Sequence, residues 1–255
     1  SLEVSPALAD DEAGTVAAAR RLAAAVARDN LLVKIPATAA GVRAIETLIG
    51  EGLKLNVTLM FSLAHVDAVA GAYQRGLEKL AASGADISRV RSVASVFLSR
   101  WDSLVDKLLD DIGTPAALAL RGKAGVALAR QAYQRYLARF HGAGFAALAA
   151  RGGRPQSMLW ASTGTKNAAY SDLMYVEPLV GPETVNTLPD ATLAAFADHG
   201  KVNGNNIAQD AEAAAAHIAA LAALGLDMNA LGERLQSEGL AQFATAFGKL
   251  LELTA

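Results

Sequence analysis

The stretch that decides the fold is LLVKIPAT at residues 31–38, where one lysine lies inside an apolar run. The aliphatic residues on both sides of Lys34 are typical of a buried β-strand, and Pro36 ends the strand because it has no backbone donor. Such a strand is expected to be covered on both faces of its sheet. Lys34 is then either a strand-end residue whose ammonium reaches water, or a desolvated amine that can attack a carbonyl carbon.

Strand and helix patterns alternate outward from this stretch. Helices are predicted over residues 12–28, 39–50 and 63–81, and strands over 31–37, 55–61 and 90–99. A helical region at 101–150, broken near 113–115 and 142, precedes a strand at 157–162, another within 174–189, and helices from 190 onward. Strict alternation with short connections predicts an α/β fold with a parallel sheet.

The strand count bears on the architecture. Six strands are predicted when residues 1–5, SLEVS, are included, whereas a closed (β/α)8 TIM barrel has eight parallel strands. We therefore expect residues 1–255 to form a single barrel domain that is N-terminally incomplete. In this interpretation the chain supplies about six strands and the C-terminal helices, the first two βα units are absent, and the chain is the carboxyl-terminal part of a larger polypeptide.

Composition restricts the function. The 255 residues carry a net charge of -2, and the basic residues are spread along the chain, which gives no electrostatic support for binding nucleic acid or a membrane surface. There are no cysteines, which removes disulfides, thiolate metal ligands and a cysteine nucleophile. No apolar run reaches the ~18 residues of a membrane span. These features favour a cytoplasmic protein that acts on small molecules.

Polar side chains follow the predicted strands at one end. In parallel α/β folds the functional residues gather at the carboxyl ends of the strands. Taken singly, each of these residues has a plain interpretation as a solvated side chain, but their shared position predicts a site. They are Glu3, Lys34, Asn56, Thr58, Ser95, Arg100, Ser162, Lys166 and Asn186.

Four motifs carry a resemblance to a known family. KIPAT at 34–38, NVTLMFS at 56–62, VASVFLSRWD at 93–102 and WASTGTKN at 160–167 resemble the motifs of transaldolases, and residues 175–189 resemble the longer bacterial form of that family. The resemblance implies transfer of a dihydroxyacetone unit from sedoheptulose 7-phosphate or fructose 6-phosphate to an aldose phosphate in the pentose phosphate pathway. It implies a lysine Schiff base, no cofactor, no metal, and a monomer or homodimer that binds sugar phosphates.

The resemblance also implies roles for individual residues. Lys34 matches the Schiff-base lysine, Glu3 the glutamate that works through a bound water, and Thr58 the threonine that holds this water. The substrate-binding residues are Asn56, Ser95, Phe97, Arg100, Ser162 and Lys166. Arg100 and Lys166 match the two cations that hold the substrate phosphate, although the more familiar family form has arginine at the second position.

One departure from the family concerns its general acid/base. Family members open with two further strands, the first of which carries an aspartate with that role, and Asp10 and Asp11 are predicted to cap a helix instead. Two other functions stay open. One is a class I aldolase acting on related sugar phosphates, and the other is an inactive barrel fragment acting as a binding module.

Overall fold

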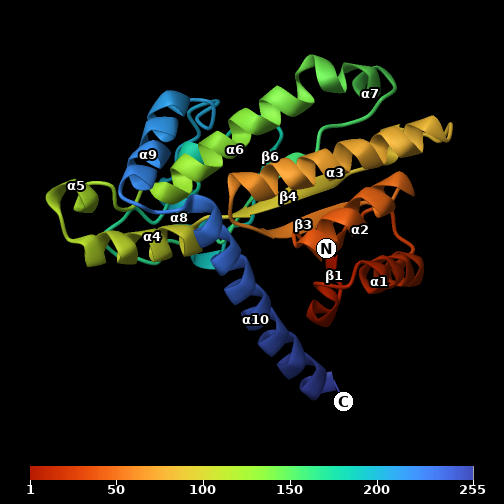
Figure 1. The fold of residues 1–255 in the computed structure, drawn as a ribbon, viewed down its shortest axis with the longest axis horizontal. Coiled ribbons are helices and arrows are strands. Elements are labelled where there is room, and N and C mark those ends of the chain that lie inside the picture. The colour runs from red at the N-terminus through yellow and green to blue at the C-terminus, as the bar shows by residue number, and fades with distance from the viewer. Residues whose placement is uncertain (255) are drawn as a thin grey trace.

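The computed structural model describes residues 1–254 and contains one parallel sheet whose six strands lie in the order of the chain (Figure 1). The strands are β1 (Leu2–Glu3), β2 (Val33–Pro36), β3 (Leu55–Met60), β4 (Ser92–Phe97), β5 (Ser157–Ala161) and β6 (Thr184–Asn186). Because consecutive strands pair in parallel, the carboxyl ends of all six strands lie at the same edge of the sheet. The predicted α/β fold is confirmed.

Helices connect the strands and cover the sheet. They are α1 (Glu12–Val26), α2 (Ala39–Gly50), α3 (Leu63–Ala82), α4 (Ser99–Ile112), α5 (Pro115–Leu118), α6 (Ala124–Phe140), α7 (Ala146–Ala150), α8 (Asp190–His199), α9 (Ala211–Ala223) and α10 (Met228–Thr254). Short 3-10 turns lie at Pro6–Leu8, Ile87–Arg89, Ala143–Phe145 and Glu177–Leu179. The side chains of Asp11, Thr38 and Ser62 cap α1, α2 and α3 by accepting a backbone N–H, which confirms the predicted capping role of Asp11.

The helical region after β4 differs from the prediction in one place. Besides the breaks predicted near 113–115 and 142, the helical region is also interrupted between α5 and α6. Gly122 has a φ of 67° there, and its N–H donates to Asp106 Oδ1 at 2.8 Å. A positive φ favours glycine and is incompatible with a continuous right-handed helix, which explains the additional break. The segment expected to supply strand residues within 174–189 contributes only β6, because Glu177–Leu179 forms a 3-10 turn.

The core lies between the sheet and its helices. Val33 and Ile35 are fully buried, whereas Lys34 between them faces the opposite side of the strand. All six residues of β3 are buried, so this strand lies at the centre of the packed structure. The predicted covering of this strand on both faces is confirmed only for the face of Val33 and Ile35, because Lys34 on the other face is 27% exposed.

The two edges of the sheet are β1 and β6. Each edge strand exposes one apolar side chain, with Leu2 39% and Val185 44% accessible. Within residues 1–254 neither β1 nor β6 has a second strand partner. An edge strand offers unpaired backbone groups to any further strand.

The last helix crosses the carboxyl ends of the strands. Figure 1 shows α10 beginning near α8 and running away from the body of the molecule to the C-terminus.

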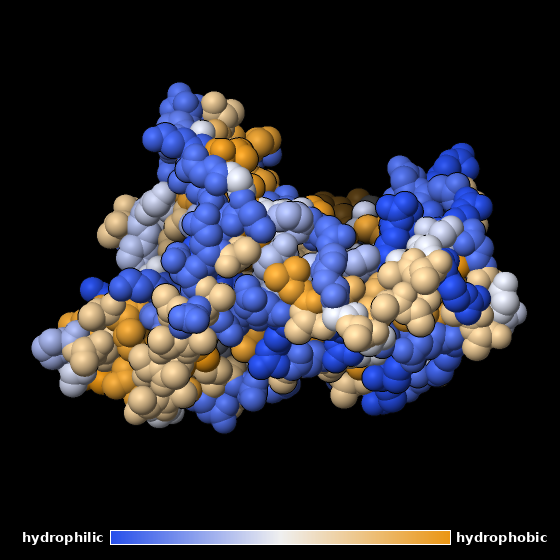
Figure 2. All heavy atoms as spheres, turned by 90° about the horizontal axis from the view of Figure 1, so that it is seen from above, coloured by the Kyte–Doolittle hydropathy of each residue, from blue (hydrophilic) through white to orange (hydrophobic). Residues whose placement is uncertain are grey.

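Among residues 1–254 no single helix is long and apolar enough to cross a membrane. Only α9 and α10 together, bent by 88° from one another, meet that requirement, by length and composition alone. Figure 2 shows hydrophilic residues over much of the face seen from above, with apolar patches toward the end where Figure 1 places α5 and α9.

Candidate active site

The central feature of the site is an ion pair between neighbouring strands. The parallel register places Glu3 of β1 opposite Lys34 of β2, and the lysine Nζ lies 3.3 Å from the glutamate Oε1. Both side chains are 27% exposed. Lys34 is therefore neither fully desolvated nor directed freely into water, and the two sequence interpretations are each only partly right. A carboxylate at this distance can accept a proton from the ammonium group, directly or through one water.

Polar residues of β3 and β4 continue the row of this pair across the sheet. Asn56 of β3 lies opposite Lys34, and its Oδ1 accepts from Ser95 Oγ of β4 at 2.7 Å. Asn56 Nδ2 donates to Ser1 Oγ at 3.0 Å, so the amide is fixed from both ends. Asn56 and Ser95 are both buried. The structure thus brings together Glu3, Lys34, Asn56 and Ser95 from four adjacent strands, as the strand-end rule predicts.

Thr58 lies at a distortion of β3. Its side chain is buried, and within residues 1–254 its Oγ1 has no hydrogen-bond partner. The next residue, Leu59, has a φ of 58°, and the register with β4 shifts between Val57 and Met60. A left-handed leucine costs about 1–3 kcal/mol and persists only where its surroundings hold it. This β-bulge therefore sets the direction of the chain just beyond Thr58.

The predicted phosphate residues lie in two different surroundings. The Arg100 guanidinium lies 5.6 Å from the centre of the Phe97 ring, and Phe97 in turn contacts Phe61 with ring centres 5.1 Å apart. Lys166 is exposed and lines a hollow of about 280 Å³ beside α4, in which Arg100 takes no part. That Arg100 and Lys166 bind the same phosphate stays a prediction.

Ser162 and Asn186 complete the predicted strand-end residues. Ser162 follows β5 with a φ of 54°, and its hydroxyl lies 2.7 Å from that of Ser99, at the start of α4. Asn186 Nδ2 donates to the Tyr175 carbonyl at 2.8 Å, while its Oδ1 is buried without a partner in residues 1–254. Ser162 is thus held by the start of α4 and Asn186 by the loop at Tyr175, and neither contacts Glu3, Lys34, Asn56 or Ser95 in the described hydrogen bonds.

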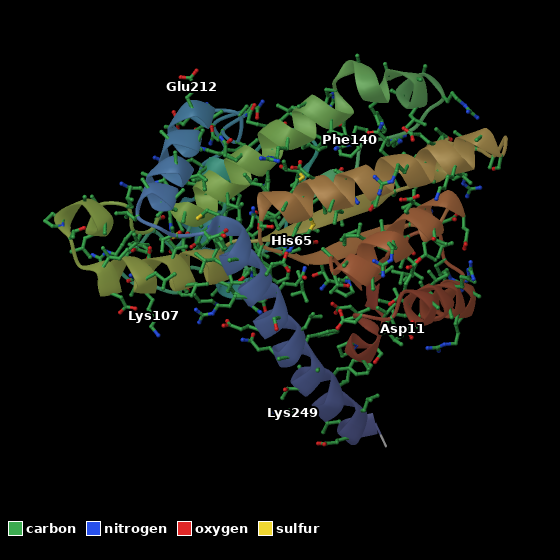
Figure 3. The ribbon with its side chains drawn as sticks, viewed as in Figure 1. Asp11, His65, Lys107, Phe140, Glu212 and Lys249 are labelled. Carbon is green, nitrogen blue, oxygen red and sulfur yellow. The ribbon has the colours of Figure 1, made fainter. Side chains whose placement is uncertain are left out.

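Two side chains near the strand ends were missed by the sequence analysis. Gln236 of α10 is buried, and its Nε2 donates to the carbonyls of Ala37 and Leu59. His65 Nδ1 accepts from the Phe61 N–H at 3.1 Å, while its Nε2 lies 2.9 Å from Glu233 of α10 (Figure 3). The only sequence signal was the small and polar face formed by residues 232, 236 and 239 in a helix of otherwise ordinary composition.

A buried carboxyl group lies behind the site on α4. Asp102 Oδ2 accepts from Tyr175 Oη at 2.6 Å, and Oδ1 accepts from the Gly125 N–H at 2.9 Å. Burial raises the pKa of Asp102 to about 6, and the two hydrogen bonds oppose this shift only in part.

We expect the pH dependence of stability to report this carboxyl group. Between about pH 4 and 6 the folded protein binds the Asp102 proton and the unfolded chain does not, so the free energy of unfolding falls as pH rises through this window. The loss is up to about 3 kcal/mol, at ~1.4 kcal/mol per pKa unit. Asp102→Asn should flatten this slope in urea unfolding, because an amide can accept from Gly125 and donate to Tyr175. Asp110→Asn, at an exposed ion pair with Arg121, is the control. Parallel curves for wild type and Asp102→Asn would contradict the assignment.

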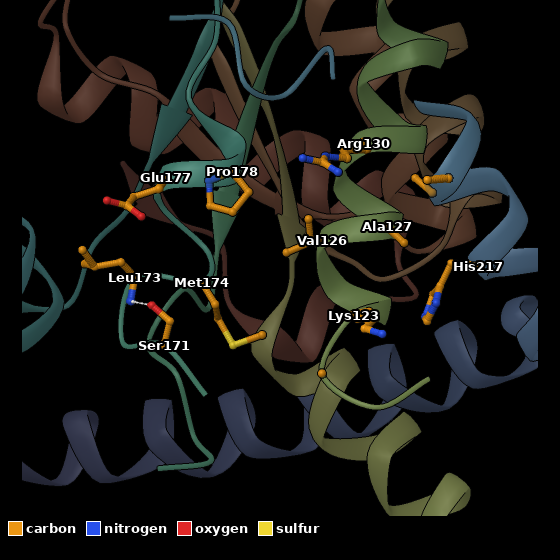
Figure 4. A pocket seen from close by; sticks show the side chains of 13 residues that line it. Lys123, Val126, Ala127, Arg130, Ser171, Leu173, Met174, Glu177, Pro178 and His217 are labelled. Atoms are coloured by element: carbon orange, nitrogen blue, oxygen red, sulfur yellow. Dashed lines mark hydrogen bonds between the residues drawn. The ribbon is translucent and has the colours of Figure 1, made fainter. Parts of the chain in front are cut away.

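A separate cavity of about 510 Å³ lies between α6, α9 and the chain at 171–178 (Figure 4). Its lining includes Lys123, Arg130 and His217, and it contains no predicted site residue. The Nε of Arg130 and the Nε2 of His217 are buried without a partner in the described chain and are closed to the cavity. Among residues 1–254 no group of three or more acidic, histidine or cysteine side chains is arranged to hold a metal ion.

The sheet and the ion pair together define a class: an α/β enzyme of the barrel type with a lysine among the polar residues at its strand ends. The family described as Transaldolase/Fructose-6-phosphate aldolase matches residues 1–254, and the chain belongs to this family. A transaldolase of Thiobacillus denitrificans is 57% identical over 251 residues, which are 98% of this chain and 70% of that protein. A transaldolase of Neisseria gonorrhoeae is 49% identical over 98% of the chain and 69% of its own length, and "Transaldolase 1" of Streptomyces coelicolor is 49% identical over 98% and 66%.

These comparisons confirm the predicted family, fold class and enzyme class. The chain has the function of a transaldolase, a transferase of aldehyde or ketone residues in the pentose phosphate pathway, and neither the aldolase nor the inactive-fragment alternative is favoured.

Proposed function

We propose that Lys34 forms the Schiff base with the ketose phosphate. The amine of Lys34 attacks the ketone carbon, and the carbinolamine loses its hydroxyl as water to give a protonated imine. The bond between the next carbon and the hydroxyl-bearing carbon beyond it then breaks. Its electron pair forms the C=C bond of an enamine while the π pair of the C=N bond moves to nitrogen, and the hydroxyl of the departing carbon gives its proton to a base as an aldose phosphate leaves. The resulting enamine attacks the aldehyde carbon of the acceptor, and hydrolysis of the new imine returns the free lysine.

The observation that carries this proposal is the 3.3 Å separation of Lys34 Nζ and Glu3 Oε1. An ammonium cannot attack a carbonyl, and Glu3 can take its proton directly or through one water. The protonated Glu3 can then give this proton to the hydroxyl that leaves the carbinolamine. One carboxyl group thus serves both proton transfers of imine formation, and Thr58, on the same face of the neighbouring strand, would hold the water between them.

The remaining predicted residues would bind the sugar. Asn56 and Ser95 present fixed polar atoms one and two strands away from Lys34, which suits the hydroxyls of the ketose. Phe97 forms an apolar wall next to Arg100, and Arg100 offers a planar donor set to the phosphate. Lys166 would act on the phosphate as a point charge, and Ser162 would line the same side of the site.

We also propose that the sheet belongs to a single (β/α)8 barrel domain. A closed barrel has eight strands, and two further strands would pair with β1 and β6 and cover Leu2 and Val185. We further propose a cytoplasmic enzyme, monomeric or homodimeric, that binds sugar phosphates. The net charge of -2 and the scattered basic residues support the proposal that it binds neither nucleic acid nor membrane.

Borohydride trapping tests the proposed role of Lys34. Incubation with fructose 6-phosphate and borohydride should add one reduced dihydroxyacetone or hexose unit to the peptide that contains LLVKIPAT, because borohydride reduces an imine to a stable amine. Mass spectrometry of the digested protein locates the adduct. An adduct on Lys54 or Lys166 in place of Lys34 would overturn the assignment, and incubation without sugar is the blank.

A further inference from the structure

Helix α10 approaches the end of β3 unusually closely, and two glycines permit this. A Cβ on Gly232 would lie 2.7 Å from Ser62 Cβ and 3.2 Å from the Phe61 carbonyl oxygen. A Cβ on Gly239 would lie 3.0 Å from Leu59 Cδ2 and 3.5 Å from Arg100 Nη1. Positions 232 and 239 are seven residues apart and therefore lie on the same face of the helix. This face of α10 packs directly on the strand end and on a predicted phosphate residue.

Gln236 lies on the same face between the two glycines. Its Nε2 is 3.1 Å from the Ala37 carbonyl oxygen and 3.0 Å from the Leu59 carbonyl oxygen. A side-chain amide has two N–H donors, and both are used here. Gln236 therefore joins the end of β2, three residues beyond Lys34, to the end of β3, one residue beyond Thr58.

The Leu59 carbonyl belongs to the strained residue of the β-bulge, which has a φ of 58°. A second link holds the same two strand ends, since the Ala37 N–H donates to the Thr58 carbonyl at 2.9 Å. A strand that slips by one residue turns all its side chains to the other face. The register of β2 and β3, in which Thr58 lies opposite Pro36, keeps the Thr58 hydroxyl on the face of Lys34, and the links at Ala37 and Leu59 hold the two strand ends in this register.

We propose that Gln236 is a positioning residue for imine formation. By holding the Leu59 and Ala37 carbonyls together, it fixes the β-bulge, and the bulge fixes the Thr58 hydroxyl relative to Lys34 and Glu3. Gln236 acts through these backbone groups and touches neither substrate nor reacting atoms. The inference rests on the proposed role of Lys34 as the Schiff-base residue.

The test compares Gln236→Met with a matched glutamine variant. Methionine keeps the unbranched length of the side chain and removes both donors. We therefore expect both the rate of borohydride-trapped imine formation and kcat to fall about ten-fold, which corresponds to ~1.4 kcal/mol, because the two hydrogen bonds at the strand ends are lost. KM for fructose 6-phosphate should change less than about two-fold, because no substrate contact is lost. Gln131→Leu is the control, because Gln131 Nε2 also donates to a backbone carbonyl, that of Ala211, far from the strand ends.

The outcomes separate positioning from general stability. The inference is supported if imine formation is slow in Gln236→Met and as fast as wild type in Gln131→Leu, with comparable melting temperatures for the two variants. Equal slowing in both variants, or wild-type imine formation in folded Gln236→Met, overturns it. If Gln236→Met does not fold, Gln236→Asn, whose amide is too short to reach both carbonyls, is held to the same criterion. If wild type itself gives no adduct on Lys34, the proposed function fails; if wild type gives the adduct and Gln236→Met forms it equally fast, only the role of Gln236 fails.

Discussion

Lys34→Ala should lose both turnover and the reducible adduct. The proposed route passes through a covalent imine at each step, so removing the amine removes the reaction path as a whole. We expect kcat/KM for transfer from fructose 6-phosphate to an aldose phosphate to fall by several orders of magnitude. A coupled assay of the released aldose phosphate measures the loss, and intact mass after borohydride treatment measures the adduct.

Two further variants make this result specific. Lys34→Arg keeps a cation beside Glu3 and supplies no nucleophilic amine, so it should fold like wild type and be equally inactive. Lys249→Ala removes an exposed lysine near the end of α10 (Figure 3) and should be as active as wild type. An adduct that persists in Lys34→Ala, or transfer activity retained by Lys34→Arg, would show that another residue carries the imine.

Most of the fold follows from periodicity and capping. The helix predicted at 39–50 agrees with α2, because Thr38 caps its start and its apolar residues repeat at helical spacing. The strands were predicted one to four residues too long; at β2, for example, the aliphatic residues 31 and 32 continue the apolar pattern although the strand begins at Val33. The break before α6 was not predicted, because it depends on a hydrogen bond to Asp106 that a local pattern cannot reveal.

The site was predictable only as far as it depends on the strand ends. The row of Glu3, Lys34 and Asn56 follows from parallel pairing, which places the carboxyl ends of strands side by side. The contacts of Gln236 join residues 177 and 199 positions apart, and they depend on the path that α10 takes over the sheet. The positive φ of Leu59 was equally hidden, because leucine gives no sign of a left-handed conformation.

The surroundings of Arg100 explain why this residue should bind the phosphate of the donor sugar. Its guanidinium lies over Phe97 and close to the backbone of α10 at Gly239, so the side chain is half-buried and restrained. A restrained guanidinium loses little freedom when it binds a phosphate, and its planar fork matches two phosphate oxygens. Arg100 should therefore contribute to binding phosphorylated donors and little to the chemistry at Lys34.

Arg100→Ala should raise KM for fructose 6-phosphate about 10- to 150-fold, while KM for free dihydroxyacetone as donor changes by less than about two-fold. The difference is the loss of a charge-assisted hydrogen bond worth ~1.5–3 kcal/mol, which only the phosphorylated donor makes. Steady-state kinetics with both donors measures it, and the adduct on Lys34 should still form at saturating sugar. Arg89→Ala, at an exposed ion pair with Asp29, is the control for loss of one positive charge. Lys166→Arg should keep KM near wild type, since a guanidinium can replace the point charge. Equal losses for the two donors would place Arg100 in a general structural role, because a phosphate contact cannot affect a donor that has no phosphate.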